Sequence, residues 1–381
     1  MESKYNSSKT GKTVGRVHVL LKGIVTLLLV AFLGLQPMVG PAVVAAAEPP
    51  PPAQHQVTVM TRNVYHGVDY EIFRVPGATS LGDLMSRVTD VYEGYHTRNF
   101  PERAQALAAE IEATHPDLIG LQEAILVRTG PLFNPGLGET VVLDYVQLLL
   151  DALSARGLNY RVVVEQVGLD VDFPSTLGFD VRHTDREVIL ARSDLPPGIL
   201  TLSNVQSGRF ADNCQLPSLA GPIPVYRGWV SVDAWARGRQ FRFISTHLDG
   251  DCPRSWGIQV AQAQEILNGP VANAGMPVII VGDINASPFS PAPSAYQALI
   301  GGGLSDAWPL AAGDSFTCCQ ADDLRNAESI LTERIDMILY QGDVDMRSIQ
   351  RVGDTAGSGT PSGLWASDHA GVVAVLELIL K

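Results

Sequence analysis

The segment VIIVGDIN, residues 278–285, ends an apolar run with two polar side chains that could act on one ligand. In a buried strand, residues i and i+2 face the same way. Asp283 and Asn285 would therefore point together while Ile284 packs into the core. A carboxylate and an amide in that arrangement can hold a water molecule beside an oxyanion. Taken alone, the segment is equally typical of a strand that ends in an Asx turn.

Other segments also bring polar residues to the edges of predicted strands. Asn63 ends the alternating run 57–64, Glu123 ends the run 117–124, and His247 ends the run 240–248. Asp336 lies in the run 334–340, and the sequence SDH precedes the last apolar run, 370–378. Buried polar side chains are costly unless they are paired, so their recurrence at strand edges predicts one shared site. The expected site residues are Asn63, Glu123, His247, Asp283, Asn285, Asp336, Asp368 and His369.

Each of these residues also has a purely structural interpretation. Glu123 could be a solvated strand end, His247 a core histidine bonded to the backbone, and Asp336 half of a salt bridge with Arg334. The whole set, in order along one chain, favours an enzyme. A zinc hydrolase is disfavoured, because only His247 and His369 are placed to coordinate and no HExxH motif occurs.

The remaining pattern mixes helices and strands. Apolar residues at helical spacing predict helices over 99–117, 140–157 and about 259–267. Further strands are expected at 161–167, 187–192 and 227–236, with a loop rich in Gly, Asp and Pro between the first two. This order predicts a single α/β domain over 57–381 with two sheets, rather than a doubly wound parallel sheet.

The first residues are typical of an export signal. Basic residues precede the apolar run 24–35, and Ala45–Ala47 offer a cleavage site. We expect a signal peptide at 1–47, a Pro-rich linker at 48–56 and a secreted, extracellular protein. A retained membrane anchor is the alternative, although the apolar run is short for a membrane span.

Charge and lysine usage narrow the chemistry. Removing residues 1–47 takes away five basic residues and one acid, so the formal charge moves from −13 to 22 minus 39, or −17. Such a chain has no general electrostatic attraction to nucleic acid or anionic lipid, although a local basic patch or a bound cation could provide one. Lys381 is the only lysine after the leader, which excludes a P-loop lysine, a Schiff base and a Ser-Lys dyad.

The chain has four cysteines, Cys214, Cys252, Cys318 and Cys319, without a CxxC spacing. An even number in an exported chain predicts disulfides rather than zinc. Three pairings are possible, and we favour Cys214 with Cys252, because the others separate the adjacent pair.

The motif order NV, QE, THL, GDIN, RID and SDH resembles the endonuclease/exonuclease/phosphatase superfamily, from about Val57 to the end of the chain. That superfamily includes pancreatic-type deoxyribonucleases, abasic-site endonucleases, neutral sphingomyelinases and inositol-phosphate phosphatases. The resemblance implies a four-layer α/β sandwich, in which two packed mixed β-sheets are flanked by helices. It also implies a metal-dependent attack of water on a phosphodiester or phosphomonoester.

The resemblance also implies roles for the site residues. Glu123 would be the principal metal ligand, Asn63 would lie beside it, and Asp368 would be a further ligand or support one. Their oxygen donors suit Mg²⁺, with Mn²⁺ or Ca²⁺ as alternatives. Asp283 and Asn285 would orient the water and a phosphoryl oxygen.

The two histidines receive roles in the same way. His247 would stabilise developing charge or protonate the leaving oxygen, and His369 would form a dyad with Asp336. The general base is either His369 or Asp283.

The substrate stays open among nucleic acid, phospholipid and small phosphate esters, and a non-catalytic binding protein is the rival from another class. No convincing match exists for the tyrosine and arginine that nucleases of this superfamily place on DNA, although Arg182 or Arg192 could face the site. The segments NVYHGVDY and FTCCQADDLRN resemble secreted bacterial members. Apolar candidates for substrate contact are Phe173, Phe179, Leu216, Trp256 and Trp365. We expect a monomer without a stable protein partner.

Overall fold

The computed structural model describes residues 55–219, 221–250, 252, 255–309 and 315–379. The expected signal peptide at 1–47 and most of the linker at 48–56 lie outside the described residues, so they stay predictions. Within the described ranges, no helix combines the length and apolar character needed to span a membrane.

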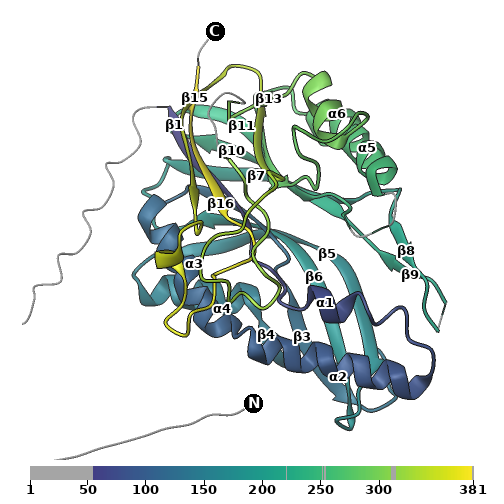
Figure 1. The fold of residues 1–381 in the computed structure, drawn as a ribbon. Helices are drawn as coiled ribbons and strands as arrows, with labels where there is room; N and C mark the ends of the chain where they lie inside the picture. Colours follow the sequence, from purple (N-terminus) through teal and green to yellow (C-terminus); the bar gives the residue numbers. More distant parts are fainter. Residues whose placement is uncertain (1–54, 220, 251, 253–254, 310–314, 380–381) are drawn as a thin grey trace, which may run out of the picture. The chain divides into compact units, whose positions relative to one another are not determined.

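The larger sheet contains the N-terminal and C-terminal strands of the described chain (Figure 1). Its order is β15-β16-β1-β2-β6-β3-β4, and β5 also pairs with β6. Only β1 and β2 run parallel to each other among the pairs recorded for this sheet in the described chain. The bounds are β1 Gln56–Asn63, β2 Leu118–Gln122, β3 Leu126–Pro131, β4 Thr140–Asp144, β5 Tyr160–Pro174, β6 Phe179–Arg192, β15 Val344–Val352 and β16 Gly371–Leu378.

The second sheet has the order β13-β14-β12-β11-β10-β7, with β11 and β12 parallel. Its strands are β7 Leu200–Arg209, β10 Gly228–Ala236, β11 Arg239–His247, β12 Val278–Asp283, β13 Ser305–Asp306 and β14 Asp336–Gln341. A separate two-stranded ribbon pairs β8, Cys214–Leu216, with β9, Ile223–Val225.

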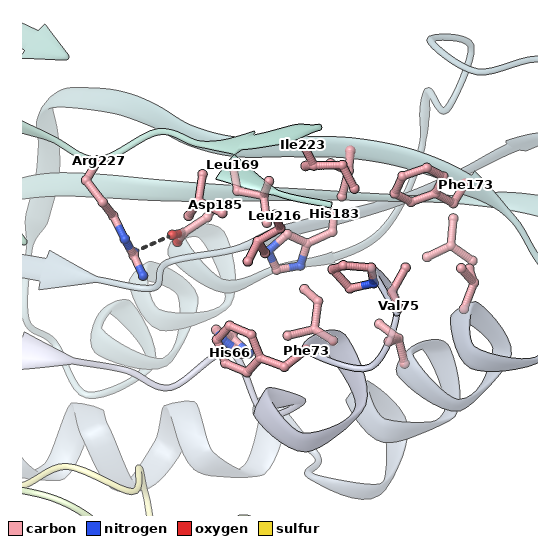
Figure 2. Close-up of a pocket in the computed structure, with 17 residues that line it drawn as sticks. His66, Phe73, Val75, Leu169, Phe173, His183, Asp185, Leu216, Ile223 and Arg227 are labelled. Carbon is pink, nitrogen blue, oxygen red and sulfur yellow. Dashed lines mark hydrogen bonds and ion pairs between the residues drawn. The ribbon is translucent and has the colours of Figure 1, made fainter. Parts of the chain in front are cut away.

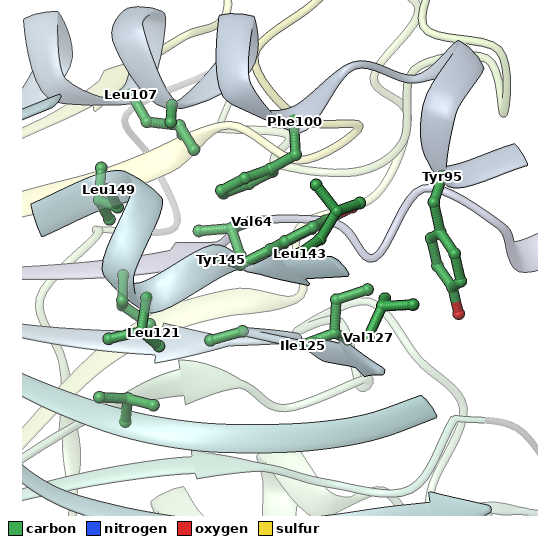
Figure 3. Packing of buried hydrophobic residues seen from close by; sticks show 14 of the residues in the cluster. Val64, Tyr95, Phe100, Leu107, Leu121, Ile125, Val127, Leu143, Tyr145 and Leu149 are labelled. Atoms are coloured by element: carbon green, nitrogen blue, oxygen red, sulfur yellow. The ribbon is translucent and has the colours of Figure 1, made fainter. Parts of the chain in front are cut away.

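Helices cover the outer faces of both sheets (Figure 1). They are α1 Asp69–Ile72, α2 Leu81–Thr97, α3 Phe100–Thr114, α4 Tyr145–Ala155, α5 Ser255–Ile266 and α6 Ala295–Gly301, with short turns of π-helix at Leu267–Val271 and 3₁₀-helix at Ala356–Ser358. Residues of α2, α3 and α4 pack on the larger sheet (Figure 3). Residues of α5 and α6 pack on the smaller one. A third apolar cluster, which includes Val59 and Phe243, fills the space between the sheets. The predicted four-layer sandwich is confirmed.

Two predictions of local structure are wrong. The predicted helix at 140–157 starts only at Tyr145, because the β-branched residues Thr140 and Val141 pair with β3 as part of a strand. Asp144 then caps α4 by accepting from the backbone N–H of Val146.

The predicted loop between 167 and 187 is instead the far part of a long β5–β6 hairpin. Its polar residues pair across the strands, since Arg182 donates to both carboxylate oxygens of Asp170 at 2.9 and 2.6 Å. The alternate residues Leu169, Val171 and Phe173 face an apolar cavity. The Gly, Asp and Pro content is typical of a loop, but the apolar residues alternate as they do in a strand.

Gly120 in β2 lets the two sheets approach closely. A Cβ atom at this position would lie 2.5 Å from both the Ser245 Oγ and a methyl group of Val281. Next to it, Gln122 donates to the Ser245 Oγ at 3.1 Å and accepts from the Thr61 Oγ1 at 3.1 Å. The close contact places the ends of β2, β11 and β12 within reach of one another.

We predict that Gly120→Ala lowers the free energy of unfolding by about 1–3 kcal/mol, because the added methyl group overpacks the space between the sheets. Urea denaturation measures the change. Gly82→Ala is the matched control, since a Cβ there has nothing within 4 Å. Wild-type stability in Gly120→Ala would contradict the close packing of the sheets.

Candidate active site

The predicted site residues meet at one end of the two sheets. The strand register places His247 beside Asp283 and Asp283 beside Asp336 across β11, β12 and β14. Most of the predicted residues line a cavity of about 290 Å³, which we call the site cavity. Asn63 and Asp336 lie behind its wall, each bonded to a residue that lines it.

Glu123 is held by donors from β1 and the loop that follows it. Asn63 donates through Nδ2 to the Glu123 Oε1 at 2.9 Å and to the Asp283 Oδ2 at 3.2 Å. The backbone N–H of His66 donates to the Glu123 Oε2 at 2.9 Å. The amide oxygen of Asn63 accepts from the backbone N–H of Tyr65 at 2.9 Å, which fixes the amide orientation. Because the amide nitrogen donates to both Glu123 and Asp283, this side chain links their carboxylates. Its predicted contact with a metal stays a prediction.

The backbone aims two of these side chains by adopting the left-handed conformation. Glu123 has φ of 58° and Asn285 has φ of 51°. That conformation is unusual for a residue such as glutamate, and it occurs where surrounding contacts over-determine the backbone. In both cases the residue follows the last residue of a buried strand by one or two positions.

His66 and Asp69 belong to the site, and the sequence analysis missed them. The His66 Nε2 lies 2.7 Å from the Asp69 Oδ1 and 3.7 Å from the Glu123 Oε2. Ligand atoms of His66, Asp69 and Glu123 all lie within 4.8 Å of one another, close enough to share a cation. Both residues stand in the segment NVYHGVDY, which could have pointed to them through the His and Asp three residues apart.

His369 and Asp336 form the predicted pair. The His369 Nδ1 lies 2.7 Å from the Asp336 Oδ2, while its Nε2 faces the Asp283 Oδ2 at 3.8 Å and the Asp368 Oδ1 at 3.9 Å. Burial acts to lower the pKa of His369, but the carboxylates of Asp336 and Asp368 raise that pKa well above its usual range. The ring therefore presents Nε2 as a donor to the cavity.

His247 has a second partner that the sequence analysis missed. Arg227 donates through Nη1 to the His247 Nδ1 at 2.9 Å and to the Asp185 Oδ2 at 3.1 Å. Arginine has only donors, so Nδ1 accepts and the proton of the neutral ring lies on Nε2. Burial first, and the charge of Arg227 second, hold the pKa of His247 well below its usual range. His247 thus faces Asp283, 3.6 Å away, with a fixed tautomer.

The site concentrates buried carboxylates. Burial raises the pKa of Asp283 to about 7, and the charges of Asp336 and Glu123 add to the effect. Burial likewise raises the pKa of Asp368 to about 7. The charge of His369 acts to lower this pKa, and the charges of Asp69 and Glu123 raise it further. Such mutual repulsion is relieved by a bound cation, and the oxygen donors fit a hard divalent ion. This crowding is the feature of the site that fits the expected metal.

Two buried arginines hold the loops that carry these residues. Arg62 forms a salt bridge with Glu110 at 2.9 Å and donates to the backbone oxygen of His369. Arg103 donates to the backbone oxygen of Ala366 at 2.9 Å, of Tyr65 at 3.0 Å, and of Val64. The C-terminal SDH segment is thereby fixed to the end of β1.

The favoured cysteine pairing is present. Cys214 is joined to Cys252, with Cα atoms 5.7 Å apart, and Cys318 is joined to Cys319. The first bond ties the β8–β9 ribbon to the loop that follows His247, and the second pair lines the site cavity.

The two arginines considered for the site lie elsewhere. Arg182 pairs with Asp170, and Arg192 pairs with Asp194 at 3.0 Å. Neither lines the site cavity, whereas Arg227 does.

The comparisons with known proteins agree with this geometry. Residues 63–369 match the profile of the family described as Endonuclease/Exonuclease/phosphatase family. A family protein from Leptotrichia buccalis C-1013-b superposes with a TM-score of 0.53 and 16% identity over 84% of this chain and 99% of that one.

Two further solved structures have the same fold. A family protein from Bacteroides thetaiotaomicron gives a TM-score of 0.51 and 16% identity over 85% of this chain and 98% of that one. TDP2 of D. rerio, complexed with single-strand DNA product, gives a TM-score of 0.50 and 16% identity over 84% of this chain and 99% of that one. No curated protein matches the chain by sequence.

We predict that the imidazole of His247 carries its proton on Nε2 and that Arg227→Met removes this preference, since Arg227 supplies the donor to Nδ1. Nitrogen-15 NMR of the histidine rings, assigned with His247→Gln, reports the tautomer. Arg209→Met is the control, because Arg209 is exposed and donates to the Val167 backbone oxygen. A wild-type proton on Nδ1 would contradict the assignment.

Proposed function

Because the chain belongs to the endonuclease/exonuclease/phosphatase family, whose members are hydrolases of phosphoesters, we propose that it is a divalent-metal-dependent phosphoesterase. It hydrolyses a phosphodiester or phosphomonoester by attack of water. The observation that carries the proposal is the burial of Glu123, Asp283, Asp336 and Asp368 beside two imidazoles in one cavity. A binding protein without turnover has no need of so costly a cluster.

Glu123 and Asp368 hold the cation, with Asp69 and His66 beside Glu123 as further donors. Mg²⁺ fits the oxygen donors best, and Mn²⁺ or Ca²⁺ fits them nearly as well. When bound, the ion supplies a positive charge that stabilises the negative charge developing on a phosphoryl oxygen.

Asp283 accepts the proton of the attacking water. Its Oδ1 is engaged by the backbone N–H of Asn285 at 2.9 Å, while its Oδ2 faces the Nε2 atoms of His247 and His369. This arrangement favours Asp283 over His369 as the base, because the Nδ1 of His369 is committed to Asp336 and its Nε2 is a donor.

His247 and His369 donate to phosphoryl oxygens. The proton on the Nε2 of His247 is the single proton of a neutral ring, since Nδ1 accepts from Arg227. This supports charge stabilisation by His247, and it leaves the protonated ring of His369 to give its Nε2 proton to the leaving oxygen as the P–O bond breaks. Asn285 donates through Nδ2 to the backbone oxygen of Leu248 at 3.0 Å, which places its amide beside the His247 ring.

The protein is also proposed to be exported. The basic and apolar residues before Ala47 support a signal peptide, and the bond between Cys214 and Cys252 suits an oxidising compartment. The expectation of a monomer stays a prediction.

We predict metal-dependent turnover of a phosphoester by the purified protein. Plasmid DNA, RNA, sphingomyelin and an inositol phosphate are assayed with Mg²⁺ and then with EDTA. Single-stranded DNA is added because TDP2 of D. rerio, of the same fold, was solved with a single-strand DNA product. EDTA is expected to abolish cleavage.

Glu123→Gln is expected to reduce the same activity by about 100-fold or more, because it removes a charge from the cation site. Glu93→Gln, at an exposed position on α2, is the matched control and is expected to keep full activity. Cleavage that persists in EDTA, or full activity of Glu123→Gln, would refute the metal-dependent mechanism.

A further inference from the structure

A second cavity opens beside the site cavity and is lined almost entirely by apolar side chains (Figure 2). Its volume is about 70 Å³. His66, Phe73 and Arg227 line both cavities, so the two are adjacent. The apolar cavity therefore begins at the residue whose backbone N–H holds Glu123.

Four parts of the chain build most of the walls of this apolar cavity, and the segment around α1 contributes Phe73. Val88 and Val91 come from α2, Phe173 comes from the β5–β6 hairpin, and Leu216 and Ile223 come from the β8–β9 ribbon. In Figure 2 His66 and Phe73 lie on one side, and Leu216 and Ile223 lie on the other. Leu216 and Phe173, two of the apolar candidates for substrate contact, thus reach the neighbourhood of the site.

The polar residues in this wall are already engaged. Asp185 is paired with Arg227 at 3.1 Å. The His183 Nδ1 lies 2.6 Å from the Tyr95 hydroxyl, and burial, followed by the charge of His66, lowers the pKa of His183 to about 3. A neutral, bonded ring adds no charge to the cavity. The lining offers an apolar guest contact surface and gives little to recognise a nucleobase or a sugar.

We propose that this cavity binds a short alkyl group carried by the phosphoester, next to the phosphate in the site cavity. The inference rests on the proposed function, because the phosphate must lie beside Glu123 for its substituent to reach past His66. The small volume favours a slim chain, since a cavity of about 150 Å³ is the size that accepts benzene.

The disulfide between Cys214 and Cys252 has a place in this arrangement. The ribbon that carries Leu216 and Ile223 starts at Cys214, and Cys252 lies in the loop after β11, which carries His247. The disulfide therefore attaches one wall of the apolar cavity to the loop that follows His247 at the end of β11. Phe73, 45% exposed, stands at the shared rim where an incoming chain would pass.

Alkylphosphonic acids test the proposal without turnover, because their C–P bond is not a phosphoester. Calorimetric titration of the purified protein with Mg²⁺ compares methyl-, propyl- and hexylphosphonic acid. We expect affinity to rise about fourfold for each of the first added methylene groups and then to level off when the cavity is filled.

Ile223→Asn places a polar group in the cavity wall and is expected to reduce the gain from methyl to propyl to less than about twofold, while the affinity for methylphosphonic acid is unchanged. Leu219→Asn is the matched control, since Leu219 lies in the same ribbon, is 54% exposed and does not line the cavity. The wild-type series decides the matter by itself if Ile223→Asn does not fold.

Equal affinity for the three acids would overturn the alkyl site while leaving the phosphate site intact. A chain-length gain that survives in Ile223→Asn would also overturn it, because the chain would then lie elsewhere. If none of the three acids binds, including methylphosphonic acid, both the proposed phosphate site and the alkyl site are refuted.

Discussion

The mutual repulsion of buried carboxylates is the constraint on which the rest of the site depends. Four carboxylates are each less than one-tenth exposed, namely Glu123, Asp283, Asp336 and Asp368. Buried carboxylates stay charged only when they are paired or bind a cation. Asn63 and the backbone N–H of His66 each donate a hydrogen bond to an oxygen of Glu123, and His369 is hydrogen-bonded to one oxygen of Asp336. The remaining negative charge supports the proposal that a divalent cation binds in this cavity.

The fold holds this unfavourable cluster together through contacts distant in sequence. Gly120 allows the sheets to approach, and Asn63 bridges Glu123, the residue after β2, and Asp283 at the end of β12. Arg62 and Arg103 bind backbone oxygens of the C-terminal segment that carries Asp368 and His369. Packing of the two sheets therefore provides the stability, and the buried arginines determine where the last motif lies. The hairpin and the ribbon form much of the apolar cavity, which shares His66, Phe73 and Arg227 with the site cavity.

Local pattern predicted the two-sheet α/β domain and the polar strand ends, whereas the four layers were expected from the family resemblance. VIIVGDIN and DLIGLQEA are short apolar runs that predict buried strands, and the structure forms those strands and brings Asp283 and Glu123 to one cavity. The hairpin at 170–186 was missed because its charged residues are satisfied across strands, which single-strand composition does not reveal. Arg227 was missed for a related reason. Its partners, Asp185 and His247, lie 42 and 20 residues away, and no local pattern links them.

Binding of Mn²⁺, measured by calorimetry without any substrate, tests the central claim most directly. The account predicts that the wild-type protein binds the ion and that Glu123→Gln weakens binding by about 100-fold, because a charged oxygen donor at the end of β2 is lost. Glu93→Gln should bind as the wild type does. Unchanged affinity in Glu123→Gln would contradict the account, since the buried carboxylates would then exist for a reason other than holding a cation.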